Sequence, residues 1–241
     1  MYQNDYQQNG YDYRQPASPQ ALPSLVSATM KRVYFKMFLA LVVTALTALF
    51  CANSASFMTF YLTNRWFMWV TIFAELGIVL GLSGGINKLS NTAAALLFYL
   101  FAVINGLMFS TIFLAYSATA IIKTFFITAG TFGAMSVYGY FTDRDLSKIG
   151  SILFMALIGL VIASVVNIFL HSSSLDWIIS IAGVAIFVGL TAWDTQQVKT
   201  MASMAPATAV SRLATLGALT LYLDFINLFL FLLRIFGGNR D

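Results

Sequence analysis

The chain has 241 residues, of which 59% are hydrophobic and 9% are charged, and its mean hydropathy is +0.82. Soluble domains carry about 25% charged residues, so this chain has too little polar surface to cover a water-soluble globule. The net charge of +4 comes from basic residues that lie between apolar segments and do not cluster as they would for nucleic acid. The composition therefore excludes a soluble domain and predicts an integral membrane protein.

Residues 1–29 differ from the rest of the chain, because Gln, Asn, Tyr, Ser and Pro dominate there and no apolar periodicity is present. Such a segment buries too little apolar surface to offset its chain entropy, so we expect a disordered polar tail. We do not expect it to be a signal peptide, since the basic-then-apolar order begins only at Lys31 and Arg32. The tail is either simply solvated or a docking handle anchored by its tyrosines.

Uncharged apolar runs divide residues 30–238, and a helix needs about 20 apolar residues to span a bilayer. We therefore expect one all-α, polytopic membrane domain. Its seven helices are predicted near residues 31–53, 66–87, 91–115, 118–141, 149–170, 177–199 and 208–236. A cytoplasmic N-terminus puts nine basic residues in cytoplasmic segments and four on the far side, in agreement with the positive-inside rule. The C-terminus is then expected on the far side.

Small residues recur at helical spacing in two of these helices. Gly77 and Gly81 are four residues apart in the second helix, and Gly130, Gly133 and Ala134 have a similar spacing in the fourth. Small residues let helix backbones approach closely in lipid. The pattern favours a compact bundle.

Three acidic residues fall inside predicted spans, namely Glu75, Asp194 and Asp224. A carboxyl group within the membrane is costly unless it is paired or hydrated, so such groups indicate functional sites. Asp194 lies toward the cytoplasmic end of the sixth helix. Asp224 has apolar helix on both sides and lies about 20 Å from either end of the last helix. These two aspartates are the candidate working site.

Two interpretations of Asp224 are open. It is either protonated and merely hydrogen-bonded to a neighbouring helix, or it meets Asp194 across the last two helices. Two carboxylates in a low-dielectric site cannot both ionise cheaply, so the pair would share a proton and act as a pH sensor. When both ionise, their oxygens would suit Ca²⁺. The amide oxygen of Asn227, three residues further along the same face, could add a ligand.

Glu75 and Lys88 are further candidates, each with two interpretations. Glu75 either lines the same cavity or is a protonated side chain bonded to a backbone carbonyl. Lys88 is predicted at a depth similar to that of Asp194. It is either a latch on that carboxylate or an interfacial lysine that reaches toward the headgroups.

The chain is not expected to be an enzyme or to hold a cofactor. The segment Gly81-Leu82-Ser83-Gly84 matches the GxSG of rhomboid-type intramembrane proteases, which need a histidine partner. The single histidine, His171, is predicted at the opposite membrane depth. The sequence also lacks HExxH, GxSxG and Walker motifs.

Three segments resemble the Bax inhibitor-1/YccA family, whose members are also called transmembrane Bax-inhibitor-motif proteins, and most closely its bacterial inner-membrane members. They are GLTAWDTQ (189–196), SVYGYFTDRDLSKIG (136–150) and GALTLYLDFINLFLFLLRIFG (217–237). The resemblance extends over about residues 30–238. It implies a seven-helix bundle with the last helix at the centre.

The resemblance also implies a function. Family members are similar to pH-sensitive Ca²⁺ leak channels that a paired-aspartate element controls, and its two acids match Asp194 and Asp224. The family's second-helix acid matches Glu75. The basic residue that pairs with the first acid in some members has its nearest match in Lys88, a residue or two away. Most relatives have Tyr where this chain has Trp193.

Two functions follow from this resemblance. The first is a passive, proton-regulated cation leak with Ca²⁺ as the permeant ion. The second is a binding regulator of a membrane-anchored AAA protease, for which residues 1–29 would serve as the handle. A proton-coupled transporter would use the same acids but would need a substrate cavity and saturable uptake.

Overall fold

The computed structural model describes residues 21–86 and 88–238. Within these ranges the chain is helical almost throughout and contains no strand. Seven of its helical segments are long and apolar enough to cross a membrane. This confirms the predicted all-α, polytopic fold. Most of the polar tail predicted at residues 1–29, with the tyrosines considered as docking anchors, lies outside the described residues.

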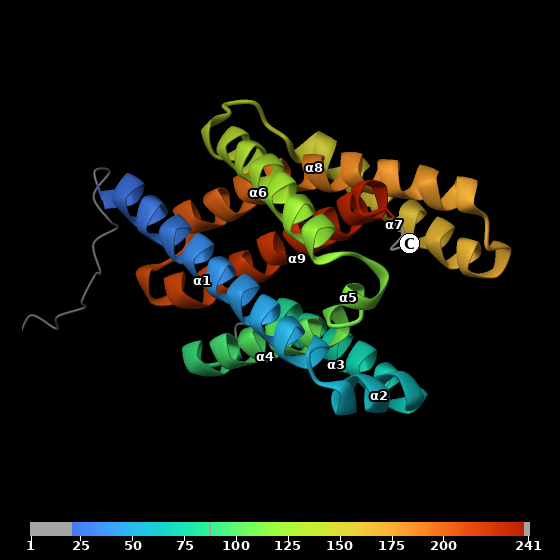
Figure 1. Ribbon diagram of the computed structural model, residues 1–241. Helices are drawn as coiled ribbons and strands as arrows, with labels where there is room; N and C mark the ends of the chain where they lie inside the picture. The colour runs from blue at the N-terminus through green and yellow to red at the C-terminus, as the bar shows by residue number, and fades with distance from the viewer. Residues whose placement is uncertain (1–20, 87, 239–241) are drawn as a thin grey trace, which may run out of the picture.

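The described elements follow one another in the order shown in Figure 1. They are α1 (Ala21–Ala52), α2 (Ala55–Thr63), α3 (Arg65–Gly85), α4 (Asn91–Phe109), α5 (Ile112–Ala115), α6 (Ala118–Phe141), α7 (Ser147–Leu170), α8 (Ser173–Met204), the 3-10 turn η1 (Ala207–Ala209) and α9 (Val210–Phe236). The short helix α5 continues the span that α4 begins. Sequence reasoning missed α2, because its nine residues are too few to cross a bilayer.

The first helix begins at Ala21, ahead of the predicted start at residue 31. Val26, Thr29 and Met30 are all buried against the bundle. The boundary placed after residue 29 was therefore too late, because Lys31 and Arg32 interrupt the apolar pattern without ending the helix.

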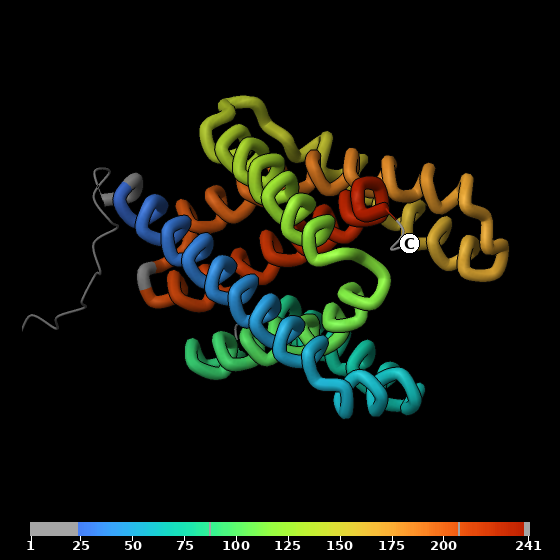
Figure 2. The backbone as a smooth tube through the Cα atoms, viewed as in Figure 1, coloured from blue at the N-terminus to red at the C-terminus, as the bar shows by residue number. Residues whose placement is uncertain are grey.

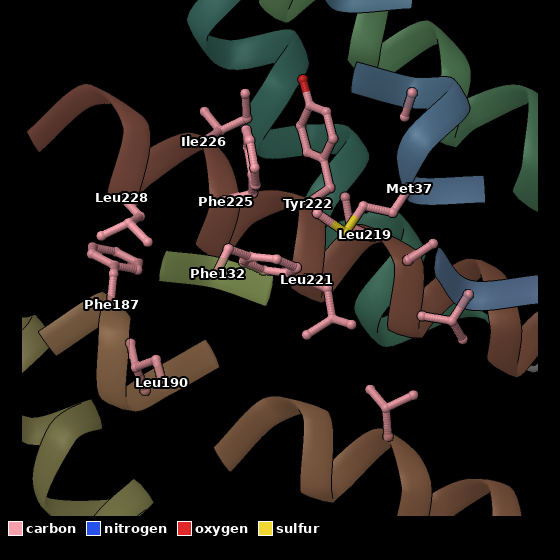
Figure 3. Close-up of a cluster of buried hydrophobic side chains, with 14 of the residues drawn as sticks. Met37, Phe132, Phe187, Leu190, Leu219, Leu221, Tyr222, Phe225, Ile226 and Leu228 are labelled. Carbon is pink, nitrogen blue, oxygen red and sulfur yellow. The ribbon is translucent and has the colours of Figure 1, made fainter. Parts of the chain in front are cut away.

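The last helix, α9, lies in the middle of the bundle (Figures 1 and 2) and packs against α8, α1, α6 and α4. It is buried along most of its length. Figure 3 shows its side chains meeting those of the surrounding helices. For example, Phe225 of α9 meets Phe132 of α6 edge to face, with ring centroids 5.5 Å apart. The central position that the family resemblance implied for the last helix is confirmed.

The closest helix contacts are made by glycines other than the predicted ones. Gly139 of α6 lies against the backbone of Ala192 in α8, and Gly106 of α4 lies against Thr44 and Thr47 of α1. A Cβ atom would meet nothing within 4 Å at the predicted glycines, which are Gly77, Gly81, Gly130 and Gly133. The spacing of small residues was a poor guide here, because it does not reveal which face of a helix meets a neighbour.

Candidate functional site: an acidic pair between the last two helices

Asp194 of α8 and Asp224 of α9 face each other across the interface of the last two helices. Their carboxyl groups are within hydrogen-bonding reach of each other. An ionised carboxylate only accepts hydrogen bonds, so such a contact requires one of the two groups to carry the proton. Asp224 is only 4% exposed, whereas Asp194 is half-buried. The structure thus brings together the two acids that the sequence singled out.

One oxygen of Asp224 is left without a partner. Its Oδ2 atom is buried and accepts no hydrogen bond from any residue that the structure describes. A buried polar atom without a hydrogen bond costs about 1–3 kcal/mol. This oxygen is therefore the atom of the pair most in need of a proton, a water molecule or a cation.

The residues on either side of Asp194 also contact other helices and so fix the position of α8 at this level. Trp193 places its indole ring against Gly150 of α7, where a larger side chain would collide with the ring. Thr195 donates from its hydroxyl to the hydroxyl of Ser136 in α6, at 3.4 Å. With Asp194 directed at α9, consecutive residues of α8 contact three different helices.

Gln196 adds a fourth contact, to the loop of residues 142–146 between α6 and α7. Its Oε1 accepts from the backbone N–H of Leu146 and its Nε2 donates to the carbonyl oxygen of Arg144, both at 2.9 Å. Sequence reasoning assigned no role to Thr195 or Gln196. The run of polar residues after Asp194 in an otherwise apolar helix was the available signal.

Tyr222, two residues before Asp224, ties α9 to the opposite side of the bundle. Its phenol lies 2.7 Å from the hydroxyl of Thr44 in α1, which in turn donates to the carbonyl oxygen of Ala102 in α4 at 2.9 Å. The ring of Tyr222 meets Phe98 and Phe101 edge to face. The helix that carries Asp224 is therefore held by α8 on one side and by α1 and α4 on the other.

Glu75 lies on α3 and is half-buried. It lies near the phenol of Tyr222, at the border of the core. Its Oε1 atom is buried and has no hydrogen-bond partner among the described residues. No hydrogen bond or ion pair links it to Asp194 or Asp224 in the described ranges.

Of the two interpretations of Lys88, the latch on Asp194 is not present in the structure. Lys88 is exposed, and it forms no ion pair with any described residue. The reason is that α3 packs mainly against α4, so its end is not delivered to α8. No described contact joins Asn227 to the pair. Its amide nitrogen donates to the carbonyl oxygen of Leu223 within α9, at 2.8 Å.

The donor set of the pair is small for a resident metal. Among residues 21–86 and 88–238, no group of three or more His, Cys, Asp or Glu side chains is able to hold an ion. Ca²⁺ takes six to eight oxygen ligands, and two carboxylates supply at most four. A cation at Asp194 and Asp224 would therefore keep part of its water shell, as a transient ion does.

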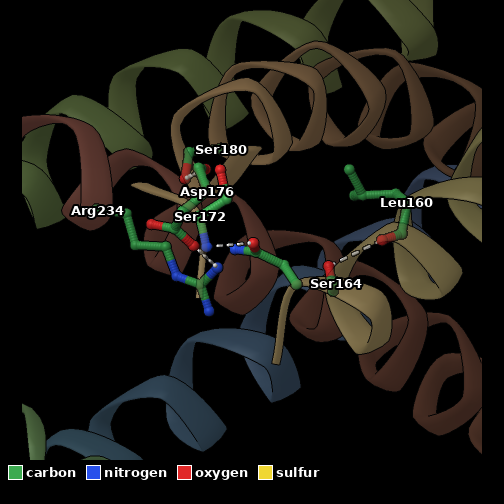
Figure 4. A network of polar contacts seen from close by, with 7 residues as sticks. Leu160, Ser164, Ser172, Asp176, Ser180 and Arg234 are labelled. Carbon is green, nitrogen blue, oxygen red and sulfur yellow. Dashed lines mark hydrogen bonds and ion pairs between the residues drawn. The ribbon is translucent and has the colours of Figure 1, made fainter. Parts of the chain in front are cut away.

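The far end of the bundle carries a separate polar cluster, at the beginning of α8 and the end of α9 (Figure 4). Arg234 lies 3.6 Å from the carboxylate of Asp176, and both side chains are about half exposed. The backbone N–H of Ser172 donates to the side chain of Asn167, which anchors the turn between α7 and α8. The acidic pair and this cluster thus lie at different levels of the α8–α9 interface.

Fold and site together define a polytopic α-helical membrane protein with two interacting carboxyl groups inside its helix bundle. The family described as inhibitor of apoptosis-promoting Bax1 matches residues 26–241, and the chain belongs to this Bax inhibitor-1 family.

The similarity to individual relatives is high over most of the chain. The chain is 51% identical over 214 residues to the inner membrane protein YbhL of Escherichia coli K12, and the aligned region covers 88% of this chain and 92% of the relative. It is 44% identical over 213 residues to the uncharacterized protein RP147 of Rickettsia prowazekii, with 88% and 90% covered. An uncharacterized protein of Borreliella burgdorferi is 42% identical over 214 residues, with 88% and 92% covered. These relatives agree with the family assignment.

Proposed function

We propose that the protein is a pH-sensitive cation leak channel with Ca²⁺ as its permeant ion, and that Asp194 and Asp224 control conduction. The observation that carries the proposal is the contact between these two carboxyl groups inside the bundle. A cation that crosses a membrane protein needs oxygen ligands in place of its lost water. The unpartnered oxygen of Asp224 would supply one of them.

The number of protons on the pair changes two properties at once. With one proton present, the two carboxyl groups can hydrogen-bond and hold α8 against α9. Without it, two negative charges lie close together in a medium of low dielectric constant, where they repel each other and attract a cation. Both effects arise from the same proton, so the flux is expected to change with pH.

We place the N-terminus in the cytoplasm and the C-terminus on the far side of an inner membrane. One relative carries the name inner membrane protein. Basic residues support the orientation, since they are concentrated at the end of the bundle where α1 begins. Those at this end are Lys31, Arg32, Lys36, Lys88, Arg144, Lys148, Lys199 and Arg212, whereas Arg65, Lys123 and Arg234 lie toward the other end. In this orientation Asp194 would be approached from the cytoplasm.

A flux assay on the purified protein tests the proposal. Liposomes that contain the protein and a trapped Ca²⁺ indicator should admit Ca²⁺ faster than empty liposomes, with a rate that depends on pH. Asp194→Asn and Asp224→Asn should each flatten this dependence. Asp176→Asn is the matched control, because it removes an acid of α8 that is half exposed and far from the pair. Unchanged rates and pH profiles in both pair variants would reject the mechanism.

A further inference from the structure

A groove of about 470 Å³ lies between α1 and α6, at the end of the bundle where α1 begins and α6 ends. This volume falls within the range of about 300–1,000 Å³ that is usual for ligand sites. Figures 1 and 2 show the two helices running along the same diagonal, with α8 and α9 behind them. Their mutual contacts are few, because each packs mainly on other helices, so the space between them is left open to the side.

The exposed surface of the walls of this α1–α6 groove is mostly apolar. Residues at helical spacing on α1 line one wall, and they are Ser27, Met30, Lys31 and Tyr34. The other wall comes from α6 and includes Phe132, Gly133, Val137 and Tyr140. Gly133 leaves the middle of the groove open, since a Cβ atom there would meet nothing within 4 Å.

Lys31 gives the groove a positive charge for which residues 21–86 and 88–238 supply no counterion. Its side chain is exposed, and it forms no hydrogen bond or ion pair with any described residue. Neither α1 nor α6 contains an acidic residue. The loop after α6 carries Asp143 and Asp145, but Arg144 lies between them. Hydrogen bonds from Ser147 hold the pKa of Asp145 below its usual value, so this carboxylate is already engaged.

We propose that the α1–α6 groove binds one anionic phospholipid of the surrounding leaflet, with its phosphate on Lys31 and an acyl chain between the two helices. The protein spans a membrane, so acyl chains are the material that surrounds an apolar groove open to the side. Basic pockets between transmembrane helices bind anionic headgroups. A zwitterionic lipid would fill the same apolar space but would not neutralise the lysine.

The bound chain would touch a residue that positions the acidic pair. Ser136 of α6 lines the groove, and its hydroxyl accepts the hydrogen bond from Thr195, the residue after Asp194. The lipid site therefore lies one side chain away from the segment of α8 that carries the acid. Lipid binding itself does not depend on the proposed channel activity.

Native mass spectrometry of the purified full chain tests the proposal. The protein in detergent is mixed with phosphatidylglycerol or phosphatidylethanolamine of identical acyl chains. We expect one phosphatidylglycerol to be retained in preference to phosphatidylethanolamine. Lys31→Gln should lower this preference about fivefold, the factor that corresponds to one basic residue at an anionic surface. Lys148→Gln, which removes an exposed lysine of α7 outside the groove, should leave it unchanged.

A second pair of variants tests the acyl-chain site. Gly133→Leu would fill the groove and should abolish retention of both lipids. Gly130→Leu is the matched control, because Gly130 also has open space around it but does not line the groove. Both variants are compared after their melting temperatures confirm folding. Equal retention of the two lipids by the wild type, or retention that survives both Lys31→Gln and Gly133→Leu, would overturn the proposal.

Discussion

Gly139 of α6 lies so close to α8 that a methyl group at position 139 would meet the carbonyl oxygen of Ala192. The obstacle is backbone rather than a flexible side chain, so it cannot move aside cheaply. Gly139→Ala should therefore destabilise the protein by roughly 1–3 kcal/mol, the usual cost of overpacking. Thermal unfolding in detergent measures the effect. Gly130→Ala, at an open position of the same helix, should be neutral or slightly stabilising; equal losses in both variants would contradict the close contact.

Tyr222→Phe should lower the free energy of unfolding by about 0.5–1.5 kcal/mol, the net contribution of one hydrogen bond. The hydroxyl of Thr44 donates to Ala102, so the Tyr222 phenol is the donor in the bond between them. The melting temperature of the variant should fall below that of the wild type. Tyr138→Phe is the control, since Tyr138 is 45% exposed on α6. If the melting temperature of Tyr138→Phe falls as far as that of Tyr222→Phe, the buried hydrogen bond contributes nothing to stability.

The pattern of charges allowed the seven spans to be predicted, because charged residues are costly in lipid and so mark where helices leave it. The same logic placed the start of α1 too late at Lys31, since a basic residue on a helix can reach the headgroups without ending it. It also selected Asp194 and Asp224, which the structure brings together. The choice between the two interpretations of Lys88 could not be made from sequence, because helix packing decides which helix end meets α8, and local sequence does not encode it.

Gln196→Ala should loosen the loop between α6 and α7, because it removes an acceptor for the Leu146 amide and a donor for the Arg144 carbonyl. Hydrogen exchange followed by mass spectrometry should show faster exchange across residues 142–146. The neighbouring substitution Gln197→Ala should not change it, since no hydrogen bond joins the Gln197 side chain to a described residue. Unchanged exchange in Gln196→Ala would mean that the loop is held by other contacts.

Arg234→Gln should lower stability by less than about 1 kcal/mol, because the ion pair with Asp176 is half exposed and solvent screens it. The loss should shrink further in 1 M salt, where charges are screened over about 3 Å. A melting curve at low and high salt checks both expectations. A large, salt-independent loss would instead point to the contact between Arg234 and the Phe231 ring as the main role of the arginine.

In the proposed mechanism, Asp194 and Asp224 act as one proton-sharing unit that controls cation flux. Groups that act as a unit give non-additive effects when they are removed together. The most direct test is the pH profile of Ca²⁺ entry into liposomes for Asp194→Asn, Asp224→Asn and the double variant. We predict that each single substitution flattens the profile as fully as the double substitution does. Partial flattening by each single variant that adds up in the double variant would contradict the claim.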